Sequence, residues 1–370
     1  MPRRSIPRPP AIDLRSDTVT RPTRAMREAM AQAAVGDDVL EGDPTVRTLE
    51  ERVAELLGKD DALLVPSGTM ANLLAIKAQT HPGDELVVHE QAHIYHWETG
   101  GYAAVAGCSI ALVPGPAGRF DPDDLESALR PDDAHCPPTR LVAIENTHNK
   151  AGGAVWPVEA IDAVAERTHA LGLRLHVDGA RLWNASVASG QPMARLVRDA
   201  DSVSVCFSKG LGAPVGSALA ADQATIDLAR RWRKMLGGAM RQAGVIASAA
   251  LYAMEHHVQR LAEDHARARR LAEGIARCAG MTLDPPEVAT NIVYARLGAG
   301  RPLAEQRRLA DGFVASMAER GVGLLAEGDG RVRAVLHLGI DDAQLERALE
   351  AWEACGQGVQ RGVSRPAPTR

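Results

Sequence analysis

The chain has 42 basic residues but only five lysines, and one of these lysines lies in surroundings suited to covalent chemistry. Lys209 follows the apolar run SVSVCF and precedes the glycine-rich segment GLGAPVGS. A primary amine that can lose its proton is able to form a Schiff base with a carbonyl compound, whereas an arginine is not. Neighbouring glycines let a flat ligand approach the backbone closely. The pattern indicates a covalent amine site, although a loop lysine in a tight turn has the same local sequence.

Asp178 ends the apolar run LRLHVDG, and Arg181 follows three residues later. A carboxylate at this place could pair with a pyridinium nitrogen and keep it protonated, which makes a pyridine ring an electron sink. Arg181 could reach the same pocket. The alternative reading of Asp178 is a simple cap of the helix that follows.

The segment PSGTMAN contains Ser67, Gly68 and Thr69 at the expected start of a helix. Free backbone N–H groups and the positive end of the helix dipole make such a turn an anion site suited to phosphate. An ordinary Ser/Thr helix cap has the same appearance.

Two histidine-containing segments follow apolar runs. HEQAH at residues 89–93 matches the H-E-x-x-H motif of zinc hydrolases, which needs both histidines on one helix. His89 closes the run ELVVH, so we expect the pair not to share a helix, while His93 could stack on a flat cofactor or act as a base. His148 follows LVAIEN; a lone histidine is more often structural, but its place past a strand end favours a role in a site.

These residues need elements that bring them together. Apolar runs alternate with helical patterns up to about residue 240, which predicts a parallel α/β sheet covered on both faces. Ligands bind beyond the carboxyl ends of such strands. Residues 242–278 have one long helical pattern, which is followed by short strands and two helices (302–320 and 341–354). We expect a disordered leader (1–11), a large domain (12–256), a small domain (257–361) and a disordered tail (362–370).

The bulk composition excludes several classes of protein. The net charge of −5 gives no basic field for nucleic acid, and no apolar run is long enough to span a bilayer. The five cysteines are widely spaced and never in C-x-x-C, which argues against disulfides and a cysteine-bound metal. A cytoplasmic location fits best.

Taken in order, eight segments resemble the threonine aldolase family of fold-type I pyridoxal-phosphate (PLP) enzymes. They are DLRSDTVTRPT, PSGTMANLLA, HEQAHIYHWETGG, IENTHNKAGGAVWP, HVDGARLWNA, SVCFSKGLGAPVGS, RKMLGGAMRQAG and RVRAVLHL. The resemblance implies an aspartate aminotransferase-like fold, with a mainly parallel seven-stranded sheet sandwiched by helices and a smaller C-terminal α+β domain. It also implies PLP as cofactor, no metal, an amino-acid substrate, and a homotetramer (a dimer of dimers) with active sites at the dimer interface.

The resemblance implies that one set of residues binds the cofactor: Lys209, Asp178, Arg181, His93, Ser67, Gly68, Thr69, Lys234 and Arg241. Lys209 would form the Schiff base, Asp178 would pair with the pyridine nitrogen, and His93 would stack on the ring. The serine, glycine and threonine would hold the phosphate. Lys234 and Arg241 would reach the phosphate region from the adjacent subunit.

The resemblance also implies substrate-binding residues and a reaction. Ser16, Arg181 and Arg333 would bind the substrate carboxylate, and His148 would lie near the side-chain hydroxyl. The implied reaction is a retro-aldol cleavage of L-threonine or L-allo-threonine to glycine and acetaldehyde. Lys209, His93 and His148 would be the catalytic residues. The base could be His93, His148 or a water that they orient.

The chain departs from the family pattern in two places. Leu40 and Glu41 stand where the family usually has tyrosine and glycine, which bears on side-chain preference, and Ala239 replaces a usual glycine, which should be a mild change. Other functions also stay open at this point. They are a PLP-dependent β-eliminating lyase or racemase on the same fold, a zinc hydrolase built on HEQAH, and a non-catalytic binding protein.

Overall fold

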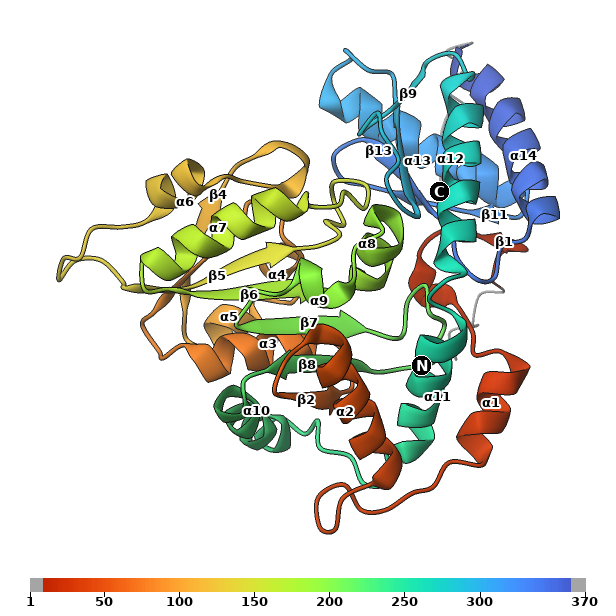
Figure 1. The fold of residues 1–370 in the computed structure, drawn as a ribbon. Coiled ribbons are helices and arrows are strands. Elements are labelled where there is room, and N and C mark those ends of the chain that lie inside the picture. The colour runs from red at the N-terminus through yellow and green to blue at the C-terminus, as the bar shows by residue number, and fades with distance from the viewer. Residues whose placement is uncertain (1–8, 361–370) are drawn as a thin grey trace, which may run out of the picture. The chain divides into compact units, whose positions relative to one another are not determined.

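The computed structural model describes residues 9–360, which fall into two compact units (Figure 1). The larger unit is Thr20–Ala262, and the smaller unit combines residues up to Val19 with those from Glu263 onward. The predicted limits at residues 12 and 256 differ from this division. The N-terminal segment joins the smaller unit because β1 (Ile12–Asp13) pairs in parallel with β11 (Val322–Gly323). Most of the predicted leader (residues 1–8) and the whole predicted tail lie outside the described residues.

The larger unit contains the predicted seven-stranded, mainly parallel sheet, which is confirmed. In sheet order the strands are β2 (Asp61–Val65), β8 (Ser217–Ala221), β7 (Ser202–Cys206), β6 (Arg174–Gly179), β5 (Thr139–Glu145), β3 (Glu85–His89) and β4 (Ser109–Val113). Only β8 runs antiparallel to its neighbours. The carboxyl ends of the other six strands therefore meet at one edge of the sheet.

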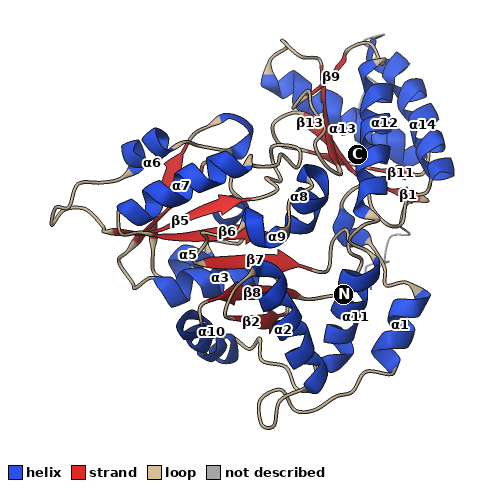
Figure 2. Cartoon of the chain, in the orientation of Figure 1, coloured by secondary structure: helices blue, strands red, loops and turns tan. Residues whose placement is uncertain are grey.

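Helices cover both faces of this sheet, as Figure 2 shows. The helices of the larger unit are α1 (Arg24–Ala31), α2 (Pro44–Leu57), α3 (Gly68–Gln79), α4 (His93–His96), α5 (Gly101–Ala104), α6 (Pro122–Ala128), α7 (Val158–Ala170), α8 (Leu182–Ser189), α9 (Met193–Leu196), α10 (Gln223–Met235) and α11 (Gly244–His256). Strand alternation explains the two layers. Leu64 packs into the core shared with α2 and α7, whereas Leu63 and Val65 pack against α3 and α10.

The smaller unit is α+β, as predicted. Its four-stranded sheet is antiparallel in the order β12 (Leu325–Ala326), β13 (Arg331–Val335), β10 (Ile292–Leu297) and β9 (Met281–Leu283). Its helices are α13 (Leu303–Glu319), α14 (Asp342–Gln360) and most of α12 (Leu261–Ala276). Phe313 and Trp352, whose ring centroids lie 5.1 Å apart, join α13 to α14 in its core.

The prediction of one long helix over residues 242–278 is wrong. The structure contains two helices, α11 and α12, separated by a turn at residues 257–260. His257 ends the first helix, and its Nδ1 lies 2.7 Å from the carbonyl oxygen of Leu211. This buried contact fixes the chain where the helical pattern of the sequence continues without a break. None of the helices described between residues 9 and 360 combines the length and apolar character that crossing a membrane requires.

Candidate active site

Five of the predicted site residues follow the carboxyl ends of parallel strands in the larger unit. Asp178 is the last residue but one of β6, and Lys209 lies just beyond β7. His93, His148 and Ser67 follow β3, β5 and β2. Because these strands are parallel, their carboxyl ends place the five residues along one edge of the sheet, as predicted.

Asp178 is the buried centre of this edge, with 2% of its surface exposed. Its Oδ2 accepts a hydrogen bond from Asn72 Nδ2 (2.8 Å), and its Oδ1 accepts one from the backbone N–H of Ala180 (3.0 Å). It does not cap α8, whose N-cap is Arg181. Burial alone would raise the pKa of this carboxyl, but the positive charges of His93 and Lys209 lower it below its usual value. The pocket therefore favours an ionised carboxylate.

His93 begins α4 and is held at both its backbone and its ring. Its N–H donates to Glu145 Oε2 (2.8 Å), and its Nδ1 lies 2.9 Å from Glu98 Oε1. Burial would lower the pKa of His93, but the hydrogen bond to Glu98 and the charge of Asp178 raise it overall. His89 ends β3, so the two histidines of HEQAH do not share a helix, and the arrangement of a zinc hydrolase is not formed.

His148 is fully buried against β3 and β5. Its ring packs edge-to-face on His89 at a centroid distance of 5.0 Å, and its Nε2 lies 3.8 Å from Glu145 Oε2. The backbone N–H of Ala151 donates to its Nδ1 (3.2 Å). Nδ1 is thus an acceptor, so a neutral ring carries its proton on Nε2.

Gly118 provides the space for the His148 ring. A Cβ added to Gly118 would lie 2.1 Å from the ring, and the φ of this residue is +75°. We expect Gly118→Ala to cost about 1–2 kcal/mol in backbone strain and about 1–3 kcal/mol in overpacking. It should also displace His148 and lower kcat.

Gly172→Ala is the matched control for Gly118→Ala, because its φ is +72° and nothing lies within 4 Å of the added Cβ. It should show the strain without the loss of activity. Chemical denaturation and steady-state kinetics measure both effects. An equal change in kcat for the two variants would show that the position of His148 does not affect the activity.

Lys209 lies half-buried in the turn after β7. Its carbonyl oxygen accepts hydrogen bonds from Thr20 Oγ1 (2.9 Å) and from the backbone N–H of Gly212 (2.9 Å). These bonds fix the backbone that carries the amine. The positive charge of Lys209 helps to lower the pKa of Asp178, so the amine lies within electrostatic range of the carboxylate.

Ser67, Gly68 and Thr69 form the N-terminus of α3. Ser67 caps the helix by accepting from the backbone N–H of Met70 (3.2 Å), so the cap interpretation is confirmed. A Cβ on Gly68 would lie 2.7 Å from Cys206 Sγ, so only glycine lets this turn lie against the end of β7. The turn presents unpaired N–H groups at the strand-end edge, which is compatible with phosphate.

The remaining predicted residues fall into three groups. Arg181 is buried, and its Nη1 donates to Asn149 Oδ1 (3.3 Å). Ser16 and Arg333 belong to the smaller unit, where Arg333 is buried on β13 opposite Tyr294 of β10. The third group, Lys234 and Arg241, lies on exposed chain at and after the end of α10. Arg241 Nη1 pairs there with Asp37 Oδ2 (3.1 Å).

Sequence reasoning missed the polar residues that join the site together: Asn72, Glu98, Glu145 and Asn149. Each occurs in a segment whose other residues were singled out. The one available signal was a polar residue inside an apolar pattern, such as the asparagine in MANLLAI. Without the fold, that residue is indistinguishable from one on a solvated helix face.

Among the described residues, His93, Glu98 and Asp178 offer ligand atoms within 4.8 Å of one another, a spacing compatible with a metal ion. Asn72 Nδ2 donates to both carboxylates across this space, at 2.8 Å each. A cation would compete with these N–H groups for the same oxygens. The donor set therefore fits a hydrogen-bonded cluster better than a metal site.

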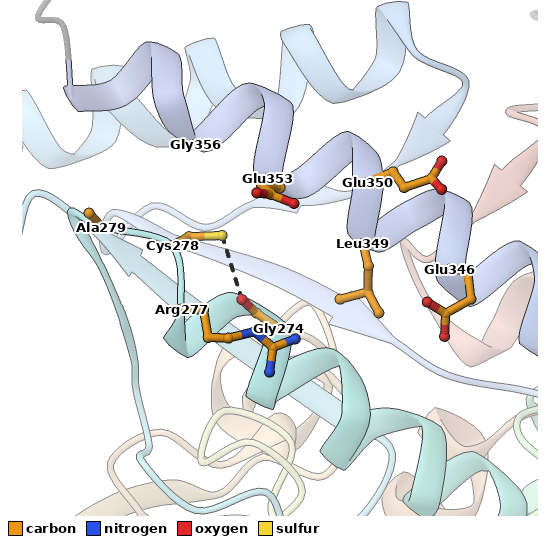
Figure 3. A pocket seen from close by; sticks show the side chains of 9 residues that line it. All are labelled: Gly274, Arg277, Cys278, Ala279, Glu346, Leu349, Glu350, Glu353 and Gly356. Atoms are coloured by element: carbon orange, nitrogen blue, oxygen red, sulfur yellow. Dashed lines mark hydrogen bonds between the residues drawn. The ribbon is translucent and has the colours of Figure 1, made fainter.

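The smaller unit contains a pocket of about 470 Å³ between α12 and α14 (Figure 3). Its walls include Arg277 and Cys278 on one side and Glu346, Glu350 and Glu353 on the other. Three carboxylates disfavour an anionic ligand such as a phosphate. None of the predicted site residues lines this pocket.

Sequence comparison gives a consistent set of relatives. The profile of the beta-eliminating lyase family matches residues 13–297. A low-specificity L-threonine aldolase of Arabidopsis thaliana is 42% identical over 363 residues, covering 97% of this chain and 99% of the relative. The low specificity L-threonine aldolase of Escherichia coli K12 is 43% identical over 344 residues, covering 93% and 98%.

Solved structures with the same fold include a threonine aldolase of Leishmania major, with a TM-score of 0.78 and 21% identity over 93% of this chain and 99% of that one. A serine palmitoyltransferase of Sphingomonas wittichii has a TM-score of 0.73 and 20% identity, covering 95% and 88%. At these identities the likeness concerns the fold, which is that of fold-type I enzymes.

Proposed function

The chain belongs to the beta-eliminating lyase family and, within it, to the threonine aldolases, and we propose that it cleaves L-threonine or L-allo-threonine to glycine and acetaldehyde. The observation that carries this proposal is the buried carboxylate of Asp178 at the strand-end edge, whose pKa is lowered by the charges of His93 and Lys209. The 42% and 43% sequence identity to threonine aldolases, over nearly the full length of the chain, supports the choice of reaction.

The donor set of the larger unit fits PLP. Asp178 offers an ionised carboxylate for a pyridinium nitrogen, and Lys209 offers the amine that would hold the cofactor. Ser67, Gly68 and Thr69 would bind the phosphate at the N-terminus of α3, where Gly68 lets the turn lie against the end of β7. When bound, PLP supplies an electron sink for the carbon–carbon bond that breaks.

We assign substrate binding to the arginines and Ser16. By their match to the family pattern, Arg181, Arg333 and Ser16 are each proposed as ligands of the substrate carboxylate, which an arginine can bind through paired hydrogen bonds. A carboxylate fixed in this way sets which bond at Cα is aligned for cleavage. The protein thereby selects bond breaking between Cα and Cβ over loss of the Cα proton.

The hydrogen bonds of the two histidines suggest complementary roles. Glu98 holds the proton on His93 Nδ1, which leaves Nε2 of the neutral ring as a lone pair that can accept the hydroxyl proton. His148 has the opposite tautomer, because Ala151 donates to its Nδ1. We therefore assign His93 as the base and His148 as a donor to the hydroxyl oxygen.

We further propose a homotetramer, built as a dimer of dimers, located in the cytoplasm. Leu40 and Met235 are 82% and 71% exposed, and the Arg241–Asp37 ion pair joins the loop of Leu40 to the loop that follows Met235 at the end of α10. A second copy of the chain would cover these apolar side chains and bring Lys234 and Arg241 to its phosphate site. Leu40 and Glu41 would then influence side-chain preference. A monomer in light scattering would contradict this assembly.

Product analysis with L-threonine tests the proposed function against its alternatives. The holoenzyme should release acetaldehyde and glycine in equal amounts, and L-allo-threonine should react as well. A β-eliminating lyase would release 2-oxobutyrate and ammonia, and a racemase would release D-amino acid. Either of those outcomes, with no aldehyde, would refute the aldolase assignment.

A further inference from the structure

Asn72 is a buried asparagine in α3 that the proposed mechanism does not use, and all of its hydrogen-bonding positions are filled. Its Nδ2 donates to Asp178 Oδ2 and to Glu98 Oε1, each at 2.8 Å. Its Oδ1 accepts from Ser204 Oγ (2.8 Å) and faces His176 Nε2 (3.1 Å). A side-chain amide has two N–H donors and two acceptor lone pairs, so this residue is fully engaged.

The orientation of the Asn72 amide is fixed from both sides. Flipping it would turn Oδ1 toward two carboxylates, which can only accept hydrogen bonds when ionised. On the other side, burial lowers the pKa of His176 to about 4, so its ring is neutral. Its Nδ1 lies 2.9 Å from Ser202 Oγ, which itself accepts from Gln79 Nε2 (2.7 Å). Asn72 Oδ1 can only accept, so the ring proton lies on Nε2 and points at Asn72, while the Ser202 hydroxyl can donate to Nδ1.

Two buried carboxylates this close normally share a proton, because both cannot ionise without a compensating donor. Burial and the charge of Asp178 raise the pKa of Glu98 overall, and the hydrogen bonds from His93 and Asn72 limit this rise. The other ionisable groups that act on Asp178 are His93, His176 and Lys209. Asn72, which carries no charge, donates a hydrogen bond to each of the two carboxylates.

We propose that Asn72 is a positioning residue that holds Asp178 and Glu98 side by side in their ionised forms, and so holds the cofactor partner and the His93 partner in one fixed arrangement. The inference rests on the proposed function, since it takes Asp178 as the partner of the pyridine nitrogen. Asn72 itself need not touch cofactor or substrate. It acts on the cofactor and on His93 through the two carboxylates.

The first test compares thermal unfolding of Asn72→Leu and Asn72→Asp with that of the wild-type full chain, without cofactor, at about pH 8.5 and about pH 5.5. Neither variant has the N–H donors, so the pKa of the carboxyl pair rises in the folded state. The wild type is then more stable than the variants above that raised pKa, and this difference in stability shrinks as the pH falls through it. The Tm deficit, by which we mean the Tm of the wild type minus that of the variant, should be smaller by at least about half at the lower pH.

Thr80→Val is the matched control, because it also removes buried hydrogen bonds at the end of α3, from Thr80 Oγ1 to the Ile76 carbonyl oxygen (2.7 Å) and from Cys108 Sγ to Thr80 Oγ1 (3.2 Å). Its Tm deficit should be the same at both pH values, and its activity should be that of the wild type. If Asn72→Leu only disturbed packing, its Tm deficit would likewise be the same at both pH values.

The second test measures PLP affinity and kinetics. In Asn72→Leu the dissociation constant of PLP should rise, and kcat should fall, by at least about tenfold, while KM changes by less than about threefold. Parallel Tm deficits at the two pH values, or wild-type PLP affinity, would overturn the proposal. A wild-type chain that binds PLP but releases no aldehyde refutes the proposed function instead, and leaves this test valid.

Discussion

Replacing Lys209 by alanine is expected to lower kcat by on the order of 10³-fold or more, because the reaction would lose its covalent attachment point. The variant should also lose the visible absorbance of a lysine-bound cofactor. The fold should be unaffected, because the hydrogen bonds of this turn are made by the backbone carbonyl of residue 209 and survive the change.

Lys77→Ala is the matched control for this variant, because Lys77 lies over the ring of Trp232 at 4.7 Å and has no part in the site. Absorbance spectra and steady-state kinetics of both variants provide the measurement. A Lys209→Ala enzyme that keeps most of the wild-type activity would place the covalent chemistry elsewhere, or show that the chain is a binding protein.

Replacing Asp178 by asparagine is expected to lower kcat by about 10²–10³-fold, the usual cost of losing a preorganised electrostatic group. The amide keeps the shape of the side chain but cannot balance a pyridinium charge. It also meets two N–H donors, from Asn72 and Ala180, with only one oxygen. KM for threonine should change much less than kcat, because the substrate carboxylate is assigned to other residues.

Asp162→Asn serves as the control for the charge itself, since Asp162 pairs with Arg195 at 2.6 Å on the partly exposed surface of α7. Kinetics at several pH values give the comparison. If Asp178→Asn and Asp162→Asn have equally small effects on kcat, then Asp178 is a structural carboxylate and not the partner of the cofactor.

The sequence predicted the edge of the sheet where the site lies, because apolar runs followed by polar residues mark the ends of parallel strands. Lys209, Asp178 and His93 could be found in this way. Asn72 and Glu98 could not, since their partners are distant in sequence: Asn72 and Asp178 are separated by 106 positions. Only the pairing of strands and the docking of α3 bring them together.

Two parts of the fold were beyond pattern reasoning for a related reason. The break between α11 and α12 depends on a contact of His257 with Leu211, and helical periodicity continues through it. The grouping of Ile12 and Asp13 with the smaller unit depends on pairing with Val322 and Gly323, more than 300 residues away. Both are tertiary contacts that override local preference.

Reduction of the holoenzyme with borohydride, followed by mass mapping of the modified peptide, tests the central claim most directly. The chain has five lysines, at positions 59, 77, 150, 209 and 234, so the label can be assigned without ambiguity. We expect the reduced cofactor on the peptide that contains Lys209, with the other four lysines unmodified. A label on any of those four, or no label on a cofactor-saturated protein, would contradict the account.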